Sequence, residues 1–219
     1  MGQTQSRRGP IARSSTWPRS CGALRAGEKV LIAMWTAAFD ASGHGHDQDC
    51  LSVAGFIAYA DRWDDFVPEW HQRLLPLRYW HTTEHKKRTD IRSRLVDMIP
   101  DFAVAKFGSA IRFDTFAQLP NPPKPAANRL NALALCGSQC VEKVYSWARS
   151  QGVPLDRVAF VFGEGDYEKD VLVNVLNASG YQTPDFRYDR DGVIKGIPHK
   201  GFIPLQASDL LVGSGNSGR

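Results

Sequence analysis

The sequence predicts a single α/β domain, a mixed sheet flanked by helices, from about Met34 onward. Three observations predict this class: strand-like segments come first, helices then alternate with one short and fully apolar segment, and no internal repeat interrupts the order. The 219 residues suffice for one well-buried core and not for two full-sized domains. With 42% hydrophobic and 23% charged residues, the composition is that of an ordinary soluble globular protein.

Residues 1–33 form a basic segment that we expect to lie outside the domain. Six basic residues stand there against Glu28 alone, a net charge of +5, so residues 34–219 carry a net charge of −1. The domain therefore offers no bulk electrostatic argument for binding a phosphate backbone. The segment fits a disordered arm, an organellar transit peptide or a start codon assigned too far upstream. We favour the last, because Met34 stands directly before the first convincing strand.

The first elements expected are two strands and a helix. Residues 35–39 form a short apolar strand, and residues 50–59 form a second strand that pairs with it as a hairpin. Helical spacing of large apolar residues predicts a helix over residues 62–75, with Asp61 as its N-cap. Pro68 lies inside this pattern, which predicts a kink or two short helices.

The middle of the chain continues with a helix, a strand and the longest helix. Residues 86–99 place apolar side chains at helical spacing, and residues 102–113 are strand-like, with Gly108 marking a bulge. Residues 118–128 contain four prolines and are expected to form a loop. Residues 128–149 then form the long helix.

The last third begins with the apolar segment 157–162, which predicts a central strand buried on both faces. Residues 167–178 form a helix that ends near Gly180. A weak strand near Phe186 and a glycine-rich hairpin lead to a last helix over residues 205–212.

The four cysteines are too sparse for a secreted disulfide scaffold, and no signal peptide precedes them. Cys136 and Cys140 share one helix face, and no second Cys or His pair follows at zinc-finger spacing, so buried small hydrophobes are the better interpretation. No apolar segment is long enough to cross a bilayer. We therefore expect a cytoplasmic protein with no role in the membrane.

Several acidic residues stand where a core-building sequence has no need of them. Asp40 ends the first strand, and Glu164 and Asp166 follow the buried strand. Asp209 lies on the last helix among apolar neighbours. Carboxylates gathered from such places repel one another unless they are protonated or bridged by a cation, and Mg²⁺ or Mn²⁺ takes oxygen ligands of this kind. Singly, each acid also fits a turn, a helix cap or an exposed helix position.

Five short segments form a set: Phe-Asp-Ala-Ser-Gly at 39–43, an aromatic-rich helix at 63–70, His-Thr-Thr-Glu-His at 81–85, Phe-Gly-Glu-Gly-Asp at 162–166 and Leu-Gln-Ala-Ser-Asp-Leu-Leu at 205–211. Together they resemble the bacterial domain-of-unknown-function 3800 family of the ribonuclease H-like superfamily. The resemblance covers roughly residues 34–212, and the last motif is its most specific part.

The resemblance implies a ribonuclease H-like mixed sheet flanked by helices and a metal-dependent nuclease, or a related phosphodiesterase, that acts on nucleic acid. In such enzymes the metal-binding acids come from the first strand, a later central strand and a C-terminal helix. Carried over by position, the metal ligands for Mg²⁺ or Mn²⁺ are Asp40, Glu164 (or Asp166) and Asp209. Asp166 supports them as a fourth catalytic acid. The accessory residues implied are His81, Glu84, Lys200 and Gln206.

Departures from the family pattern leave a second hypothesis open. Ala41 replaces the usual Glu after the first Asp, and Gly163 stands where an acid is expected, so Glu164 is that acid shifted by one position. The last helix is expected to stop at Val212, which is truncated relative to the family. A catalytically inactive nucleic-acid- or protein-binding module of the same fold therefore remains an alternative, as does an unrelated α/β enzyme whose acids are caps and turns.

Overall fold

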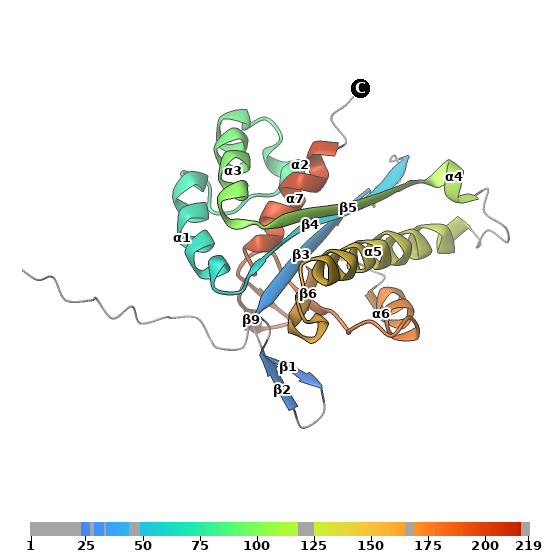
Figure 1. Cartoon of the computed structure of the whole chain (residues 1–219). Helices are drawn as coiled ribbons and strands as arrows, with labels where there is room; N and C mark the ends of the chain where they lie inside the picture. Colours follow the sequence, from blue (N-terminus) through green and yellow to red (C-terminus); the bar gives the residue numbers. More distant parts are fainter. Residues whose placement is uncertain are drawn as a thin grey trace, which may run out of the picture.

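The computed structural model describes residues 23–26, 29–32, 34–43, 49–117, 125–164 and 169–215. The central strands are β3 (Trp35–Ser42), β4 (Cys50–Tyr59), β5 (Ala105–Arg112), β6 (Val158–Gly163) and β7 (Asp185–Arg187). They form one five-stranded sheet in the order β5-β4-β3-β6-β7, and helices cover both of its faces (Figure 1). The predicted mixed sheet flanked by helices is confirmed.

Pairing within this sheet is antiparallel on one side of β3 and parallel on the other. β3 and β4 form the predicted hairpin, and β4 pairs antiparallel with β5, whereas β6 runs parallel to both β3 and β7. The prediction of a bulge at Gly108 is wrong, because the β4–β5 register continues without interruption through the pair Ala54↔Gly108. Asp40 also lies inside β3 and not at its end, because pairing continues to Ser42↔Ser52.

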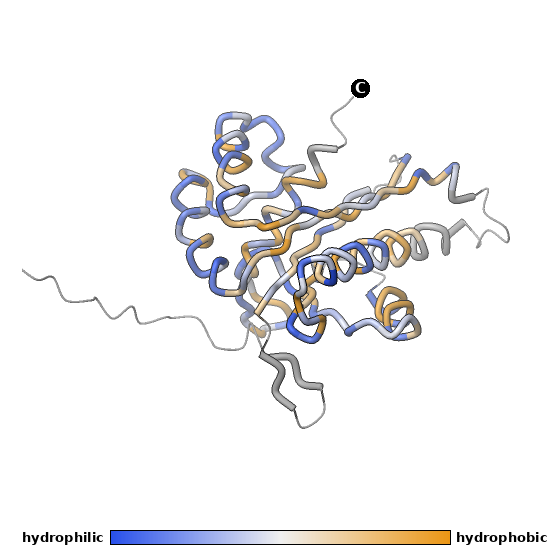
Figure 2. The backbone as a smooth tube through the Cα atoms, viewed as in Figure 1, coloured by the Kyte–Doolittle hydropathy of each residue, from blue (hydrophilic) through white to orange (hydrophobic). Residues whose placement is uncertain are grey.

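The helices are α1 (Arg62–Leu74), α2 (Thr82–His85), α3 (Thr89–Phe102), α4 (Phe113–Ala117), α5 (Pro125–Ser150), α6 (Lys169–Ala178) and α7 (Pro204–Gly215), with a 3-10 turn at Leu155–Arg157. α5 and α6 cover one face of the sheet, and α1, α3 and α7 pack on the other. In Figure 2 the sheet and the helix sides that face it are largely apolar.

Alternation along the central strands assigns each side chain to one of these faces. On β3, Phe39 packs in the core under α5 and α6, whereas Ala38 packs against Val161 and Leu205 on the α7 face. Asp40 has the same parity as Ala38 and so points toward α7. β6 is buried on both faces, as its unbroken apolar pattern predicted.

Two helix predictions need correction. α1 runs through Pro68 as one helix and is not divided, since burial of Trp63 and Trp70 outweighs the one backbone hydrogen bond that proline removes. Asp61 occupies the N-cap position without a side-chain capping hydrogen bond. α3 begins three residues later than expected, and the short helix α2 precedes it in a segment for which no helix was predicted.

The buried cysteines behave as predicted. Cys136 and Cys140 lie in the core, with their thiols against the carbonyl oxygens of Leu51 and Val53. Burial raises the pKa of the Cys140 thiol to about 12, which leaves it unreactive at neutral pH. The three cysteines within the described ranges are free thiols.

The two ends of the chain differ from the simplest expectation. Within the predicted N-terminal extension, β1 (Ala23–Ala26) and β2 (Lys29–Ile32) pair as a separate two-stranded sheet, and the rest of residues 1–33 lies outside the described part. The last helix continues to Gly215, past the predicted end at Val212. Of the loop predicted over residues 118–128, the first seven residues are not described, and α5 already begins at Pro125. Within the described ranges, none of the helices combines the length and apolarity needed to span a membrane.

Candidate active site

A polar cleft of about 430 Å³ opens beside the carboxyl ends of β3 and β6, where they meet α7 and the chain between β7 and a hairpin, β8 (Gly192–Ile194) and β9 (Ile197–His199). Three of the four predicted catalytic acids line it: Asp40, Glu164 and Asp209. The fourth, Asp166, lies outside the described residues. The structure therefore brings one acid from the first strand, one from the end of the central strand and one from the last helix to the same cleft.

Asp40 approaches the backbone of β6 closely at Gly163. The β3–β6 register pairs Phe39 with Phe162, so the next residues along the two parallel strands, Asp40 and Gly163, also lie side by side. A Cβ atom built on Gly163 would lie 2.8 Å from Oδ1 of Asp40, closer than such contacts occur. Glycine at this position thus makes room for the Asp40 carboxylate.

Glu164 follows β6 directly and is held by two contacts. Its backbone N–H donates to the carbonyl oxygen of Arg187 at 2.8 Å. Its Oε1 accepts a hydrogen bond from Nζ of Lys169, the first residue of α6, at 2.5 Å. This contact raises the pKa of Lys169, so the ammonium group stays charged beside the carboxylate. A cation from the chain itself therefore already neutralises Glu164.

Asp209 is half-buried and is held by the contacts of α7 with its neighbours. α7 is fastened to β3 by Ser208, whose Oγ donates to the carbonyl oxygen of Ala38 at 2.9 Å. Asp209 Oδ2 accepts a hydrogen bond from the Thr82 N–H at 2.6 Å, and Thr82 Oγ1 donates to the Asp209 carbonyl oxygen at 3.2 Å. Burial raises the pKa of Asp209, and the hydrogen bond from Thr82 opposes this rise.

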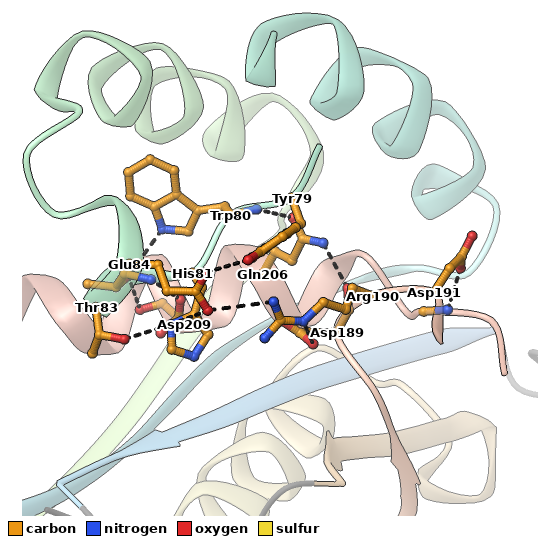
Figure 3. A network of polar contacts seen from close by, with 12 residues as sticks. Tyr79, Trp80, His81, Thr83, Glu84, Asp189, Arg190, Asp191, Gln206 and Asp209 are labelled. Carbon is orange, nitrogen blue, oxygen red and sulfur yellow. Dashed lines mark hydrogen bonds and ion pairs between the residues drawn. The ribbon is translucent and has the colours of Figure 1, made fainter. Parts of the chain in front are cut away.

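The segment that carries His81 and Glu84 forms the wall next to Asp209 (Figure 3). His81 lines the cleft, and its Nδ1 lies 2.8 Å from Oγ1 of Thr83. Glu84 accepts a hydrogen bond from the Tyr79 hydroxyl, which lowers the pKa of Glu84 and raises that of Tyr79. Arg190 lies 3.6 Å from Oε1 of Glu84 and stacks over the Tyr79 ring, 4.1 Å from its centroid. Glu84 thus holds Arg190 at the cleft and stays ionised.

Of the four accessory residues only His81 lines the cleft; Glu84 lies behind it, and Gln206 and Lys200 lie elsewhere. Gln206 is 1% exposed, and its Oε1 accepts hydrogen bonds from Trp70 Nε1 at 3.1 Å and from the Trp80 N–H at 2.8 Å. Its Nε2 donates to the carbonyl oxygen of Asp189 at 2.8 Å. Both ends of this amide are therefore used to join α7 to its neighbours. Lys200 is exposed and lies outside the set of residues that line the cleft.

Sequence reasoning missed the far wall of the cleft, which the chain after β7 supplies. The residues concerned are Arg187, Tyr188, Asp189, Arg190, Asp191, Gly192 and His199. The signal was the polar run Arg-Tyr-Asp-Arg-Asp at 187–191, directly after the weak strand. Such a run beside the carboxyl end of a parallel strand lies where α/β sheets place their ligand sites.

The acids suit a hard divalent cation in their chemistry, because all of their donor atoms are carboxylate oxygens. Among the residues that the structure describes, no three His, Cys, Asp or Glu side chains are grouped closely enough to hold one ion. Glu164 is turned to Lys169, and Asp209 is engaged by Thr82. For these acids to bind an ion, Glu164 must therefore release Lys169 and bind the ion in its place.

Comparison with known proteins supports the fold. No protein-family model matches the chain, and no curated protein matches its sequence. The structure is similar to that of the PCNA:RNase HII complex from Archaeoglobus fulgidus, with a TM-score of 0.50, 12% identity, and coverage of 82% of this chain and 71% of the other. Ribonuclease H2 from Pyrococcus horikoshii OT3 matches with a TM-score of 0.38 and 11% identity, over 82% of this chain and 70% of the other. The chain has a ribonuclease H-like α/β fold.

Proposed function

We propose that this protein is a divalent-metal-dependent nuclease, or a related phosphodiesterase, in which Asp40, Glu164 and Asp209 hold Mg²⁺ or Mn²⁺. One observation carries the proposal: these three acids come from β3, the end of β6 and α7 to a single cleft in a ribonuclease H-like fold. The resemblance to the domain-of-unknown-function 3800 family implies this set of elements for the metal-binding acids. A bound divalent cation supplies positive charge that stabilises the charge developing on a transferring phosphoryl group.

The proposed partner is nucleic acid, and the cleft offers groups of the chain to bind it. Arg187 and Arg190 line the same cleft as the acids, where their guanidinium groups suit phosphate oxygens. Arg190 is set in place by Tyr79 and Glu84. The cleft lining sets these two arginines against five carboxylates, so phosphate would be bound there by individual guanidinium groups and by bound cations, not by a net positive charge. Recognition then depends on the site and not on the overall charge.

Membership of the domain-of-unknown-function 3800 family is also a proposal. It is supported by contact between two of the segments that carry the resemblance, since Thr82 and Asp209 are joined by two hydrogen bonds although 127 positions apart. A cytoplasmic location is proposed as well, in keeping with the free thiols of the described cysteines.

An inactive nucleic-acid- or protein-binding module of the same fold is the second candidate. The pair between Lys169 and Glu164 favours it, because a lysine that permanently neutralises Glu164 would take the place of a metal ion. Ala41 points the same way, since it removes a second acid beside Asp40. In that case Lys169→Met would allow metal to bind, whereas the wild type would bind none.

A cleavage assay tests the first candidate. Labelled single- and double-stranded DNA, RNA and an RNA–DNA hybrid are incubated with the protein in Mg²⁺, in Mn²⁺ and in a chelator. We expect metal-dependent cleavage of at least one substrate, with a loss on the order of a hundredfold or more in Asp40→Asn and in Asp209→Asn. The control is Asp170→Asn, which removes an exposed carboxylate from the first turn of α6. Cleavage that persists in both site variants would refute the assignment of these acids.

A further inference from the structure

His199, at the end of β9, is a residue of the cleft for which the proposed metal site has no use. It stands opposite Gly192 in the β8–β9 register. A Cβ atom on Gly192 would lie 2.7 Å from Cε1 and 3.0 Å from Nε2 of the imidazole, so the ring lies against a backbone that only glycine leaves open. The other neighbour is Tyr188, whose ring centroid is 4.2 Å from that of His199. The ring is therefore fixed between two parts of the cleft wall.

The two ring nitrogens of His199 have different surroundings. Nδ1 is shut off from solvent and has no hydrogen-bond partner in the part of the chain that the structure describes. Neutral imidazole carries its proton on one nitrogen and leaves the other as an acceptor. Because a buried N–H without an acceptor is rarer than a buried acceptor without a donor, the proton belongs on Nε2. Nε2 is then the nitrogen that can donate into the cleft.

We propose that His199 is a substrate-binding residue, whose Nε2–H donates a hydrogen bond to a non-bridging phosphate oxygen of nucleic acid in the cleft. This inference rests on the proposed function, because the phosphate must lie next to Asp40 and Asp209. His81 belongs to the opposite wall, next to Asp209, and so would meet another part of the substrate. No proton is transferred in this role: His199 binds and orients the phosphate.

Two substitutions separate this role from simple packing. The amide nitrogen of His199→Gln can reach the place of Nε2 and still donate, whereas the shorter amide of His199→Asn reaches only the place of Nδ1. We expect binding of phosphate to weaken roughly tenfold in His199→Asn and by less than about threefold in His199→Gln, because a hydrogen bond to a charged group is lost only in the first. The control is His71→Gln, a change of an exposed histidine on α1.

The test measures the Kd of a fluorescently labelled, phosphorothioate-linked oligonucleotide by anisotropy, and KM and kcat on the substrate that is cleaved best. Thermal melting of each variant shows that it is folded, and NMR of ¹⁵N-labelled imidazoles reports which nitrogen of His199 carries the proton.

The expected result is a higher Kd and KM in His199→Asn, values near those of the wild type in His199→Gln, and a proton on Nε2 of His199 in the wild type. Equal losses in the two variants, no loss in either, or a proton on Nδ1 would overturn the proposal. An oligonucleotide that binds with this pattern but is never cleaved would sink the nuclease assignment and leave the His199 contact standing. Failure of the oligonucleotide to bind at all would overturn both.

Discussion

At the scale of single residues, the site consists of acids whose surroundings differ. Asp209 is half-buried and accepts a short hydrogen bond from Thr82, Glu164 is neutralised by Lys169, and Asp40 lies against Gly163. The three acids could be predicted from the sequence as candidate site residues, because carboxylates beside apolar strands and on an apolar helix are unusual. Their partners could not be predicted, because threonine and lysine are common residue types and no local pattern pairs Thr82 with Asp209 or Lys169 with Glu164.

Asp209 predicts a pH dependence of stability. Its pKa is raised in the folded state, so the folded protein binds more protons than the unfolded chain above the ordinary Asp pKa of about 3.9. The stability that protonation gives is present below that pH and is lost as the pH rises through the raised pKa. The amide of Asp209→Asn does not ionise, so this variant does not lose stability as the pH rises. Its carbonyl oxygen still accepts the Thr82 hydrogen bond. We expect its Tm at pH 7 to exceed that of the wild type by a few degrees. This difference should disappear below about pH 4, and a Tm difference independent of pH would contradict the account.

Gly163→Ala is predicted to weaken metal binding without unfolding the protein. The methyl group of Gly163→Ala would meet the end of the Asp40 side chain, which can move at little cost. We therefore expect the free energy of unfolding to change by less than about 1 kcal/mol. The Kd for Mn²⁺ should rise roughly tenfold, as is usual when a ligand loses its orientation. Gly108→Ala is the control, because its added methyl group meets only an ordinary contact at 3.4 Å from Ala54 on the same sheet. An unchanged Mn²⁺ affinity in Gly163→Ala would show that Asp40 is not a ligand.

At the scale of elements, the sequence predicted what local patterns determine. The apolar runs of β4 and β6 and the helical spacing of α1 placed these elements to within a residue or two. Where the prediction failed, contacts between elements decide. α2 is held by the bonds between Thr82 and Asp209 of α7, which lie 127 positions apart. β3 extends past Asp40 because the next strand, β4, continues to pair with it up to Ser42↔Ser52.

Substitution of Gln206 is predicted to lower the free energy of unfolding, because its amide joins α7 to the neighbouring elements. Gln206→Leu keeps the size of the side chain but leaves the Trp70 and Trp80 N–H groups buried without their acceptor. A loss of about 3 kcal/mol follows from the cost of unsatisfied buried groups, which lowers the Tm by about 6–12 °C in a chain of this size. Hydrogen exchange should show faster opening of the segment at Trp80. The comparison variant is Gln139→Leu, whose exposed side chain accepts one bond from Ser109; an equal effect of both changes would contradict this role of Gln206.

At the scale of the whole molecule, the sequence alone could not show that the three acids meet. Positions 40, 164 and 209 come together through the parallel pairing of β3 with β6 and the packing of α7 across β3. The positions of the acids beside apolar strands and on an apolar helix, together with the family resemblance, predicted that they gather, but not which contacts bring them together. The wall from residues 187 to 199 was not anticipated, because a three-residue strand and a short hairpin leave little pattern in the sequence.

The boundary of the domain gives a prediction for the whole chain. The β1–β2 hairpin is a sheet of its own, separate from the five-stranded sheet. A shortened chain that begins at Met34 should therefore keep a Tm within about 2 °C of the full chain, as expected when less than about 1 kcal/mol is lost. Thermal melting of the two proteins measures this. A fall of many degrees would place the N-terminal segment in the core.

Titration calorimetry with Mn²⁺ tests most directly whether the cleft is a metal site. If Asp40, Glu164 and Asp209 hold the ion, the wild type should bind it, with an affinity that Asp40→Asn weakens tenfold or more, or roughly 1.4 kcal/mol. Asp97→Asn, which removes an exposed carboxylate from α3, should bind Mn²⁺ as the wild type does. Binding should also stabilise the wild type by about 2.7 kcal/mol at a hundredfold excess over the Kd. A folded wild type that releases no heat of binding, or an Asp40→Asn variant that binds Mn²⁺ equally well, would contradict the metal site.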